Sequence, residues 1–549
     1  MAAANIRYPD RRALYYEGTV ITGRELTEKV DSWAIRFLKM GVRPGHIVTI
    51  ALPNCPQAVY SIYALNKIGA VSSIVHSAAA AEELFEKIKL TESRLIITLP
   101  EIAARIGKHI EGMGITPRFL ITELNDEIPS AKGNRRSETT KLESMFPDCD
   151  IIRWSGRIRD SQPKGSDKNI FPYPMSDDTA VIIYSGGTTG ESKGIEITNG
   201  NLNHIGKSVI ACTPMLRPEM NDTFAVCLPI FHGFGLGVGI HCSLYNGLGC
   251  TLIPSFSAKT FARTIQESKS NIFIGVPSMY EKIIAMPSME KIDWANIKGI
   301  FCGGEKLSSQ LEDKIDEYLE KRHAKVRICE GYGLAENLSV ATISPVNCKR
   351  KGSVGIPIAN TYIRIISPET QEELPYGQEG EICISGPGIM KGYFKNASAT
   401  AKCIYKDKDL RKWLRTGDAG YMDDDGFLYI SARMSRMIII NGYNLYPHVI
   451  ENLINTYPAA EKTYVTDANG IDNLHYIKAY VVLKTGIQPC EELQSKIIKY
   501  CREKTTLYSI PMEIEFVSGF PTTELGKISI RRLSEISRNS GQIFSSSHG

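Results

Sequence analysis

The chain has 549 residues, of which 43% are hydrophobic and 23% charged, a composition typical of a globular protein with more than one domain. Its net charge is only +4 and it has no long basic run, which argues against a nucleic-acid partner. The apolar runs are too short for a transmembrane segment, and the charged first twenty residues do not resemble a secretion signal. The 13 cysteines form no CxxC pair, which predicts reduced thiols in a cytoplasmic protein and argues against a zinc site.

Short apolar runs alternate with helical patterns in the first half of the chain. Strand, helix, strand, helix and strand are predicted in turn at residues 47–52, 57–68, 71–75, 81–90 and 95–99. The same alternation returns at residues 223–285, and such units predict a parallel sheet covered by helices. The polar, irregular segment 129–178 is predicted to be a surface excursion between sheet elements.

The pattern changes to short strands and turns at about residue 352 and changes again after Ser431. We therefore expect a large N-terminal domain at 1–431, with a β-rich subdomain at about 352–431, and a small C-terminal domain at 432–537. The Ser-rich residues 538–549 are predicted to be a disordered tail. The expected fold class is α/β, with helix-covered mixed sheets and a β-rich subdomain in the large domain and α+β structure in the small one.

A glycine-rich loop, Ile183-Tyr-Ser-Gly-Gly-Thr-Thr-Gly-Glu-Ser-Lys-Gly194, directly follows a predicted strand. Glycines let backbone amides approach anionic oxygens, and threonine hydroxyls and a lysine ammonium add further donors. The predicted phosphate-binding residues are Ser185, Gly186, Gly187, Thr188, Thr189, Gly190 and Lys193. The lysine does not directly follow the last glycine, so the loop is not a Walker loop; a flexible surface turn is the alternative explanation.

This loop resembles the phosphate-loop signature of the adenylate-forming superfamily, which includes acyl-CoA synthetases, luciferases and peptide-synthetase adenylation domains. The sequence departs from the usual signature by an additional glycine at Gly186-Gly187 and by Ser192 in the place of proline. The resemblance implies that ATP and Mg²⁺ bind here, with Thr188 as a catalytic hydroxyl and a ligand of the metal. Further signatures follow in the superfamily's order, from about residue 8 to residue 533.

Two of these signatures resemble adenine-contacting turns. They are Gly303-Gly304-Glu305 and Glu330-Gly331-Tyr332-Gly333-Leu334-Ala335-Glu336. The resemblance implies that Tyr332 packs against adenine and that Glu336 is catalytic as a ligand of Mg²⁺. Ala335 stands where the superfamily usually has threonine, and ordinary core packing is the alternative explanation for Tyr332.

The segment Pro229-Ile-Phe-His-Gly-Phe-Gly235 resembles the mouth of an acyl pocket. The resemblance implies that the catalytic residue His232 borders the carboxylate that is activated, whereas a satisfied core histidine is the alternative. Glycines at alternate positions, 233, 235, 237 and 239, have two explanations that stay open: space for a long or wide acyl group, or helix packing.

Signatures near the C-terminus resemble the remaining parts of the nucleotide and thiol sites. Thr416-Gly-Asp418 resembles a ribose-binding turn, in which one carboxylate can accept hydrogen bonds from both sugar hydroxyls. By resemblance, Arg433 contacts ribose, Ser435 is the pivot of a mobile C-terminal domain, and Gly442 and Tyr443 flank the thiol channel. Lys527, which ends Pro521-Thr-Thr-Glu-Leu-Gly-Lys527, resembles the catalytic lysine.

The implied reaction has two steps. A carboxylic acid is already ionised at neutral pH, so its attack on the α-phosphate of ATP needs positive charge, here Lys527, Lys193 and Mg²⁺, rather than a general base. The small domain then rotates and the thiol of coenzyme A displaces AMP. We therefore expect an acid–thiol ligase with a carboxylic acid, ATP and coenzyme A as substrates; the sequence does not specify the acid.

Three alternatives stay open at this point. The acyl group may be loaded onto the phosphopantetheine of an acyl carrier protein instead of coenzyme A. Amino-acid activation is disfavoured, because Phe231 is followed by His232 where an aspartate is usual. From another class, the departures at Gly186, Ala335 and Ser435 would suit an inactive acyl-nucleotide binding protein.

Overall fold

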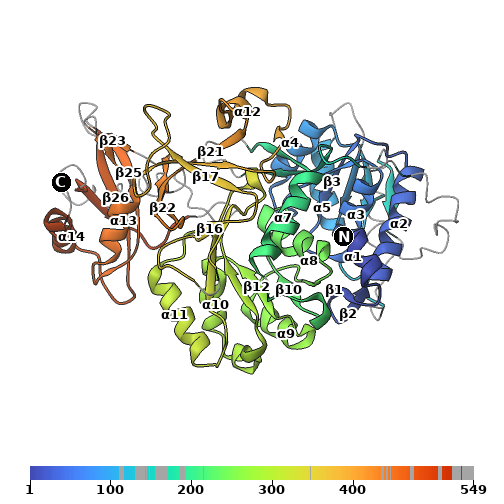
Figure 1. Ribbon diagram of the computed structural model, residues 1–549, viewed down its shortest axis with the longest axis horizontal. Coiled ribbons are helices and arrows are strands. Elements are labelled where there is room, and N and C mark those ends of the chain that lie inside the picture. The colour runs from blue at the N-terminus through green and yellow to red at the C-terminus, as the bar shows by residue number, and fades with distance from the viewer. Residues whose placement is uncertain are drawn as a thin grey trace. The chain divides into compact units, whose positions relative to one another are not determined.

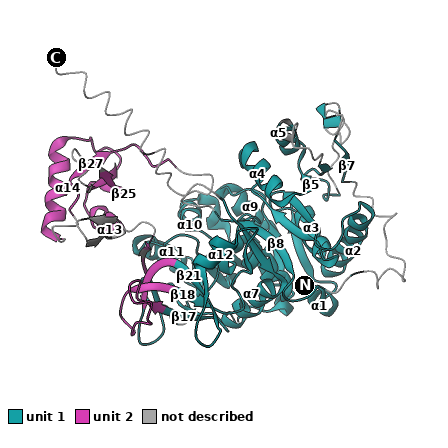
Figure 2. Cartoon of the chain, turned by 90° about the horizontal axis from the view of Figure 1, so that it is seen from above, with its two compact units in different colours: residues 1–364, 383–416, 422–429 teal, residues 365–382, 417–421, 430–549 magenta. Residues whose placement is uncertain are grey.

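The chain forms two compact units in the computed structural model (Figure 2). One comprises Met1–Arg364, Cys383–Thr416 and Met422–Tyr429; the other comprises Ile365–Ile382, Gly417–Tyr421 and Ile430–Gly549. The domain division after residue 431 stays a prediction. The structure describes residues 1–110, 117–129, 142–143, 145–146, 149–154, 171, 174–185, 192–213, 215–345, 348–434, 438–440, 443–445, 447–469, 475–504, 510–521 and 533.

The first sheet of the larger unit has eight strands. In order across the sheet they are β19 (Gly392–Tyr393), β9 (Gly194–Thr198), β8 (Thr179–Tyr184), β4 (Val71–Ile74), β3 (Ile47–Ala51), β5 (Leu95–Thr98), β6 (Arg118–Ile121) and β7 (Ile151–Arg153). The strands from β8 to β7 pair in parallel, while β9 is antiparallel to both β8 and β19. The alternation predicted at 47–99 is thus confirmed, but β7 is a strand inside the segment predicted to be an excursion.

The second sheet has nine strands. In order they are β16 (Ile356–Pro357), β15 (Thr342–Ile343), β14 (Ile328–Tyr332), β13 (Gly299–Cys302), β12 (Ile272–Gly275), β10 (Thr223–Val226), β11 (Gly249–Leu252), β1 (Arg12–Tyr16) and β2 (Thr19–Thr22). Parallel pairing runs from β14 to β1, and antiparallel strands close both edges. One continuous cluster of buried apolar side chains joins this sheet to the first.

Helices connect and cover the strands of both sheets (Figure 1). They are α1 (Ala2–Arg7), α2 (Gly23–Lys39), α3 (Pro56–Lys67), α4 (Ala81–Thr91), α5 (Pro100–Ile110), α7 (Asn199–Cys212), α8 (Ser243–Tyr245), α9 (Ala258–Ser268), α10 (Pro277–Ile284) and α11 (Ser309–Glu320). The glycine-rich stretch after β10 is a π-helix, η3 (Phe234–Cys242), a form often found at functional sites. Short 3₁₀ turns occur at Pro218–Met220, Pro287–Lys291, Trp294–Asn296 and Ala335–Asn337.

The remaining strands form the β-rich region and the sheet of the second unit. A five-stranded sheet contains β17 (Tyr362–Ile366), β18 (Gly380–Ser385), β21 (Lys412–Met422) and β20 (Ile404–Lys406), with β22 (Leu428–Arg433) paired to β21 and α12 (Ala397–Cys403) before β20. The second unit has a hairpin, β23 (Ile438–Ile440) and β24 (Tyr443–Leu445), and a three-stranded sheet with two helices. These last elements are β25 (Ala460–Asn469), β26 (His475–Leu483), β27 (Glu513–Phe516), α13 (Pro447–Asn455) and α14 (Glu491–Lys504).

The expected fold class is confirmed: a large α/β part with helix-covered mixed sheets and a small α+β part. The small part has a core of its own around Ile454, Val465, Val481 and Ile497. No helix within the described stretches combines the length and hydropathy that a membrane span needs. The predicted tail at 538–549 lies outside the described residues.

Candidate active site

The two turns predicted to contact adenine lie side by side. Cys302, the last residue of β13, pairs in register with Glu330 of the parallel strand β14. The first turn follows β13 directly, and the second motif begins in the last residues of β14, so a Cβ added at Gly303 would come within 3.1 Å of the carbonyl oxygen of Gly331. Ligands of open parallel sheets bind outside the carboxyl ends of the strands, and the predicted turns occupy such an edge.

The backbone of these turns requires glycine at two positions. Gly304 has φ +81°, a left-handed conformation that side chains disfavour. A Cβ at Gly333 would lie 2.5 Å from backbone atoms of Ser339 and Val340, so packing alone excludes a side chain there. Tyr332 is buried, and its contact with adenine stays a prediction.

An apolar cavity opens beside the two turns. Its volume is ≈ 30 Å³, which makes it a narrow cavity, and it is partly open to solvent. Gly303 and Gly331 form one part of its wall, and Phe224 of β10 with Phe234 and Val238 of η3 form another. No charged side chain of the described residues lines it, so an apolar group can enter without desolvating a charge.

The alternating glycines of η3 serve packing rather than cavity space. A Cβ on Gly235 would approach the carbonyl oxygen of Pro229 to 2.3 Å, and one on Gly237 would approach Cγ of Leu338 to 2.8 Å. A Cβ on Gly239 would lie 2.8 Å from Ile274. Close approach of η3 to its neighbours therefore decides between the two explanations that the sequence left open.

His232 lies on the surface, so the alternative of a buried core histidine is wrong. Its Nδ1 accepts a hydrogen bond of 3.2 Å from the backbone N–H of Phe234, which places the proton of a neutral ring on Nε2. The preceding segment is held by Asn54, which accepts from the N–H of Ile230 at 2.8 Å and donates to the carbonyl of Leu228 at 2.9 Å. Sequence reasoning missed Asn54, because its partners lie more than 170 residues away.

The described ends of the phosphate loop are closed by two hydrogen bonds. The N–H of Ser185 donates to the carbonyl of Lys193 at 3.1 Å, and the hydroxyl of Ser192 donates to the carbonyl of Ser185 at 3.0 Å. The serine that replaces the usual proline thus fastens the base of the loop. The predicted phosphate ligands Gly186, Gly187, Thr188, Thr189 and Gly190 lie outside the described residues.

Glu336 and Lys193 are both in contact with Tyr393, a residue that the sequence analysis did not identify. The Tyr393 hydroxyl donates to Oε1 of Glu336 at 2.8 Å, and Nζ of Lys193 lies 5.2 Å from the centroid of the tyrosine ring. A predicted phosphate ligand and one of the two predicted metal ligands therefore share one neighbour. The order of residues gave no signal for this, because Tyr393 follows Glu336 by 57 residues.

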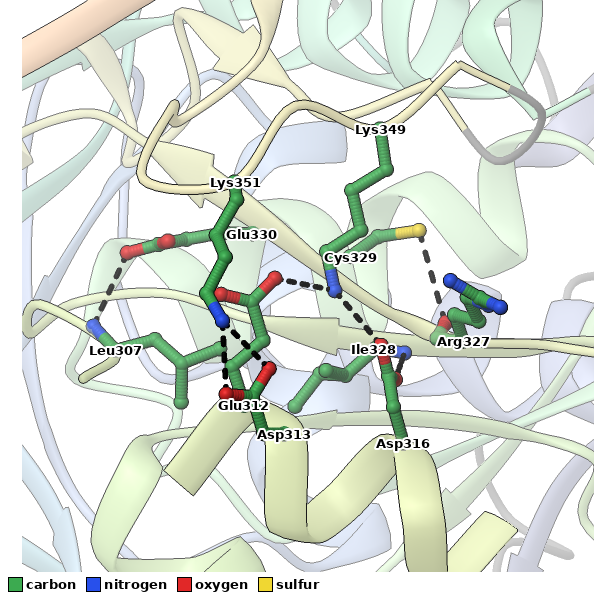
Figure 3. A network of polar contacts seen from close by, with 10 residues as sticks. All are labelled: Leu307, Glu312, Asp313, Asp316, Arg327, Ile328, Cys329, Glu330, Lys349 and Lys351. Atoms are coloured by element: carbon green, nitrogen blue, oxygen red, sulfur yellow. Dashed lines mark hydrogen bonds and ion pairs between the residues drawn. The ribbon is translucent and has the colours of Figure 1, made fainter. Parts of the chain in front are cut away.

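The buried carboxylate of Glu330, in β14, is bonded to the loop after the first turn (Figure 3). Glu330 is 7% exposed, and its Oε1 accepts a hydrogen bond of 3.1 Å from the backbone N–H of Leu307, just after the first turn. Burial raises the pKa of Glu330 to about 7. Nearby, Lys349 pairs with Glu312 at 2.6 Å and with Asp316 at 3.3 Å, which fastens the following loop to α11.

The residues predicted to bind ribose contact one another in the second unit. Nε of Arg433 lies 2.9 Å from Oδ1 of Asp418, whose side chain is buried. Gly417, with φ +68°, donates its N–H to Glu381 at 3.2 Å and shapes the turn. The ribose-binding roles of both residues stay predictions.

Several predicted residues cannot be placed. Ser435, Gly442 and Lys527 lie outside the described residues; Tyr443 begins β24, but its side chain is not described. Within the described ranges, no group of three or more His, Cys, Asp or Glu side chains could hold a metal ion. Of the two predicted ligands of Mg²⁺, Thr188 lies outside the described residues, and the role of Glu336 stays a prediction.

Two family models match the chain. The AMP-binding enzyme family matches residues 2–394, and the AMP-binding enzyme C-terminal domain matches residues 449–527. A long-chain-fatty-acid–CoA ligase of Bacillus subtilis (strain 168) is 30% identical over 540 residues, 96% of this chain and 92% of that protein. A probable 4-coumarate–CoA ligase 3 of Dictyostelium discoideum is 26% identical over 538 residues, 97% of this chain and 93% of that protein.

Solved structures share the fold at lower identity. ATP-bound MatB from Rhodopseudomonas palustris superposes with a TM-score of 0.80 at 22% identity, covering 96% of both chains. The o-succinylbenzoate CoA synthetase of Bacillus subtilis, in complex with its acyl-adenylate intermediate, gives a TM-score of 0.75 at 23% identity and covers 97% of this chain and 96% of that one. Both similarities show a shared fold that consists of a large N-terminal part and a small C-terminal part.

Proposed function

The chain belongs to the AMP-binding enzyme family of adenylate-forming ligases, and we propose that it activates an apolar carboxylic acid with ATP and transfers the acyl group to coenzyme A. The match to the family covers both parts of the chain, and the curated relatives named above are acid–CoA ligases.

The apolar cavity beside the two glycine turns is the observation that carries the proposal. Its wall includes Gly303 and Gly331, so an acid bound there would have its carboxylate near the nucleotide turns and its tail among Phe224, Phe234 and Val238. Burying an ionised group in such a wall without a partner costs several kcal/mol. The cavity therefore favours fatty or aromatic acids over dicarboxylic acids and amino acids.

The proposed first step forms a bond between a carboxylate oxygen of the acid and the α-phosphorus of ATP, and pyrophosphate leaves. Two anions must approach each other, so the step needs positive charge and fixed geometry rather than a base. His232, whose Nε2 carries the proton, is suited to donate a hydrogen bond to the carboxylate, and Lys193 and Lys527 to offset phosphate charge. In the second step the sulfur of coenzyme A bonds to the acyl carbon, AMP leaves and the thiol proton passes to solvent.

Pyrophosphate exchange across a panel of acids tests both parts of the proposal. Wild-type protein is incubated with ATP, Mg²⁺, labelled pyrophosphate and long-chain, medium-chain, cinnamic-type, dicarboxylic or amino acids, and coenzyme A is then added. We expect exchange with apolar monocarboxylic acids and an acyl-CoA product.

The alternatives give different results in the same panel. Exchange that continues unchanged when coenzyme A is added, with acyl transfer to a phosphopantetheinylated carrier protein, would replace coenzyme A as the acceptor. ATP binding without exchange for any acid would contradict the proposal and favour an inactive acyl-nucleotide binding protein. Exchange confined to dicarboxylic or amino acids would refute the substrate class.

A further inference from the structure

Tyr393 is held at the edge of the eight-stranded sheet, next to the returning end of the phosphate loop. It pairs with Ile195 in the antiparallel ladder of β19 and β9, and the N–H of the next residue, Phe394, donates to the carbonyl of Gly194 at 2.7 Å. The N–H of Tyr393 itself donates to the hydroxyl of Thr400 at 2.9 Å. Its backbone is thus fixed against the residue that directly follows Lys193.

The side chain contacts two groups of opposite charge in two different ways. Its hydroxyl donates to the Glu336 carboxylate at 2.8 Å, while the ammonium of Lys193 lies near the ring at 5.2 Å from the centroid. Glu336 is fixed in turn by its backbone carbonyl, which accepts from the N–H of Met390 at 2.7 Å. A tyrosine hydroxyl is protonated at neutral pH, so it donates to the carboxylate and carries no charge itself.

We propose that Tyr393 is a positioning residue that keeps the Lys193 ammonium and the Glu336 carboxylate apart and orients both for Mg²⁺-bound ATP. Both charged groups contact the same side chain. A direct ion pair between them would use up both the positive charge meant for phosphate and the oxygen meant for the cation. The tyrosine offers each charge a neutral neighbour. The hydroxyl occupies one acceptor direction on Oε1, and the carboxylate keeps its other acceptor directions.

The proposal rests on the proposed function only in that ATP must bind with Mg²⁺; it does not depend on which acid or thiol reacts. Tyr393→Phe keeps the ring beside Lys193 and removes the hydroxyl, whereas Tyr393→Leu removes both contacts. Tyr476→Phe is the matched control, because the hydroxyl of Tyr476 donates to Oε2 of Glu513 at 2.7 Å within the small three-stranded sheet.

Equilibrium binding of ATP is measured by calorimetry over a range of Mg²⁺ concentrations and again in EDTA, with thermal melting as the folding control. Loss of a hydrogen bond to a charged group should raise the Mg²⁺ concentration for half-maximal ATP affinity roughly tenfold in Tyr393→Phe and leave the affinity in EDTA within about twofold. Tyr393→Leu should weaken ATP binding in EDTA as well, because Lys193 loses its aromatic neighbour. The control should match the wild type in every measurement.

Two results would overturn the inference. One is Mg²⁺ dependence in Tyr393→Phe equal to that of the wild type, and the other is an equal loss of affinity with and without Mg²⁺. A double-mutant cycle with Glu336→Gln adds an independent measurement: the two substitutions should be non-additive, and full additivity would also overturn the inference. Wild-type protein that binds Mg²⁺-ATP but activates no acid would contradict the proposed function alone, whereas failure to bind ATP would contradict both.

Discussion

Glu330→Gln tests the buried carboxylate behind the adenine turns. The pKa of Glu330 is raised from an ordinary 4.5 to about 7, chiefly by burial and further by Glu312, against the opposing influence of the Leu307 N–H, Lys306 and Lys349. The folded chain therefore retains this proton at a pH where the unfolded chain has lost it. A pKa difference of this size between the folded and unfolded chain changes the free energy of unfolding by about 3 kcal/mol across the pH range.

Proton linkage gives the direction in which the stability of the wild type changes with pH. Because the folded-state pKa is raised, the stability that the wild type gains from holding this proton is complete below pH 4.5 and lost as pH rises from about 4.5 to 7. Glutamine has no charge, and its amide oxygen can still accept the N–H of Leu307. We expect Glu330→Gln to be about 1–3 kcal/mol more stable than the wild type at pH 8, and this advantage to shrink below pH 5.

Thermal melting of both proteins at half-unit intervals from pH 4.5 to 8.5 measures the effect. Glu320→Gln, an exposed position on α11, is the control and should show no such trend. A melting-temperature difference between Glu330→Gln and the wild type that does not depend on pH would refute the raised pKa. A difference that favours the wild type at high pH would mean that the ionised carboxylate has a partner that outweighs its burial.

Three further substitutions test separate parts of the site. Val238→Phe should fill part of the cavity and shift the preferred acid to shorter chains, while the affinity for ATP stays unchanged. If pyrophosphate exchange shows an unchanged chain-length preference, the cavity is not the acyl site. Asp418→Ala should weaken ATP binding at least tenfold if its carboxylate accepts two ribose hydroxyls, and calorimetry that finds wild-type affinity in a folded variant would exclude that role. Lys527→Ala should slow acyl-AMP formation by roughly two to three decades. The same variant should still transfer the acyl group from supplied acyl-AMP to coenzyme A. Normal adenylation by this variant would refute the lysine's role.

The sequence predicted best the elements whose pattern depends on local burial. Parallel strands buried on both faces give continuous apolar runs, so β3, β4 and β5 were located to within one or two residues. Helix α2 was missed, although Thr22 and Glu25 form a capping box at its start that could have indicated it. Strand β25 was missed because polar residues such as Lys462, Thr466 and Asp467 interrupt its apolar pattern.

Site residues were found where they belong to a contiguous motif and missed where the fold alone brings them in. The turns at Gly303 and Gly331 follow from short motifs, and the structure places them beside each other. Asn54 and Tyr393 act through partners far away along the chain, so no spacing rule could identify them. Whether the glycines of η3 leave space or allow packing depends on neighbours such as Leu338, which only the folded chain reveals.

Transfer of oxygen from the acid to AMP tests the central claim most directly. An apolar carboxylic acid labelled with ¹⁸O in both carboxylate oxygens is incubated with the wild-type protein, ATP, Mg²⁺ and coenzyme A, and the nucleotide products are analysed by mass spectrometry. Adenylation followed by thiolysis leaves one carboxylate oxygen on the departing phosphate, so the account predicts AMP with one ¹⁸O for each acyl-CoA formed. Label in inorganic phosphate with ADP as the nucleotide product, or AMP without label, would contradict an acyl-adenylate intermediate.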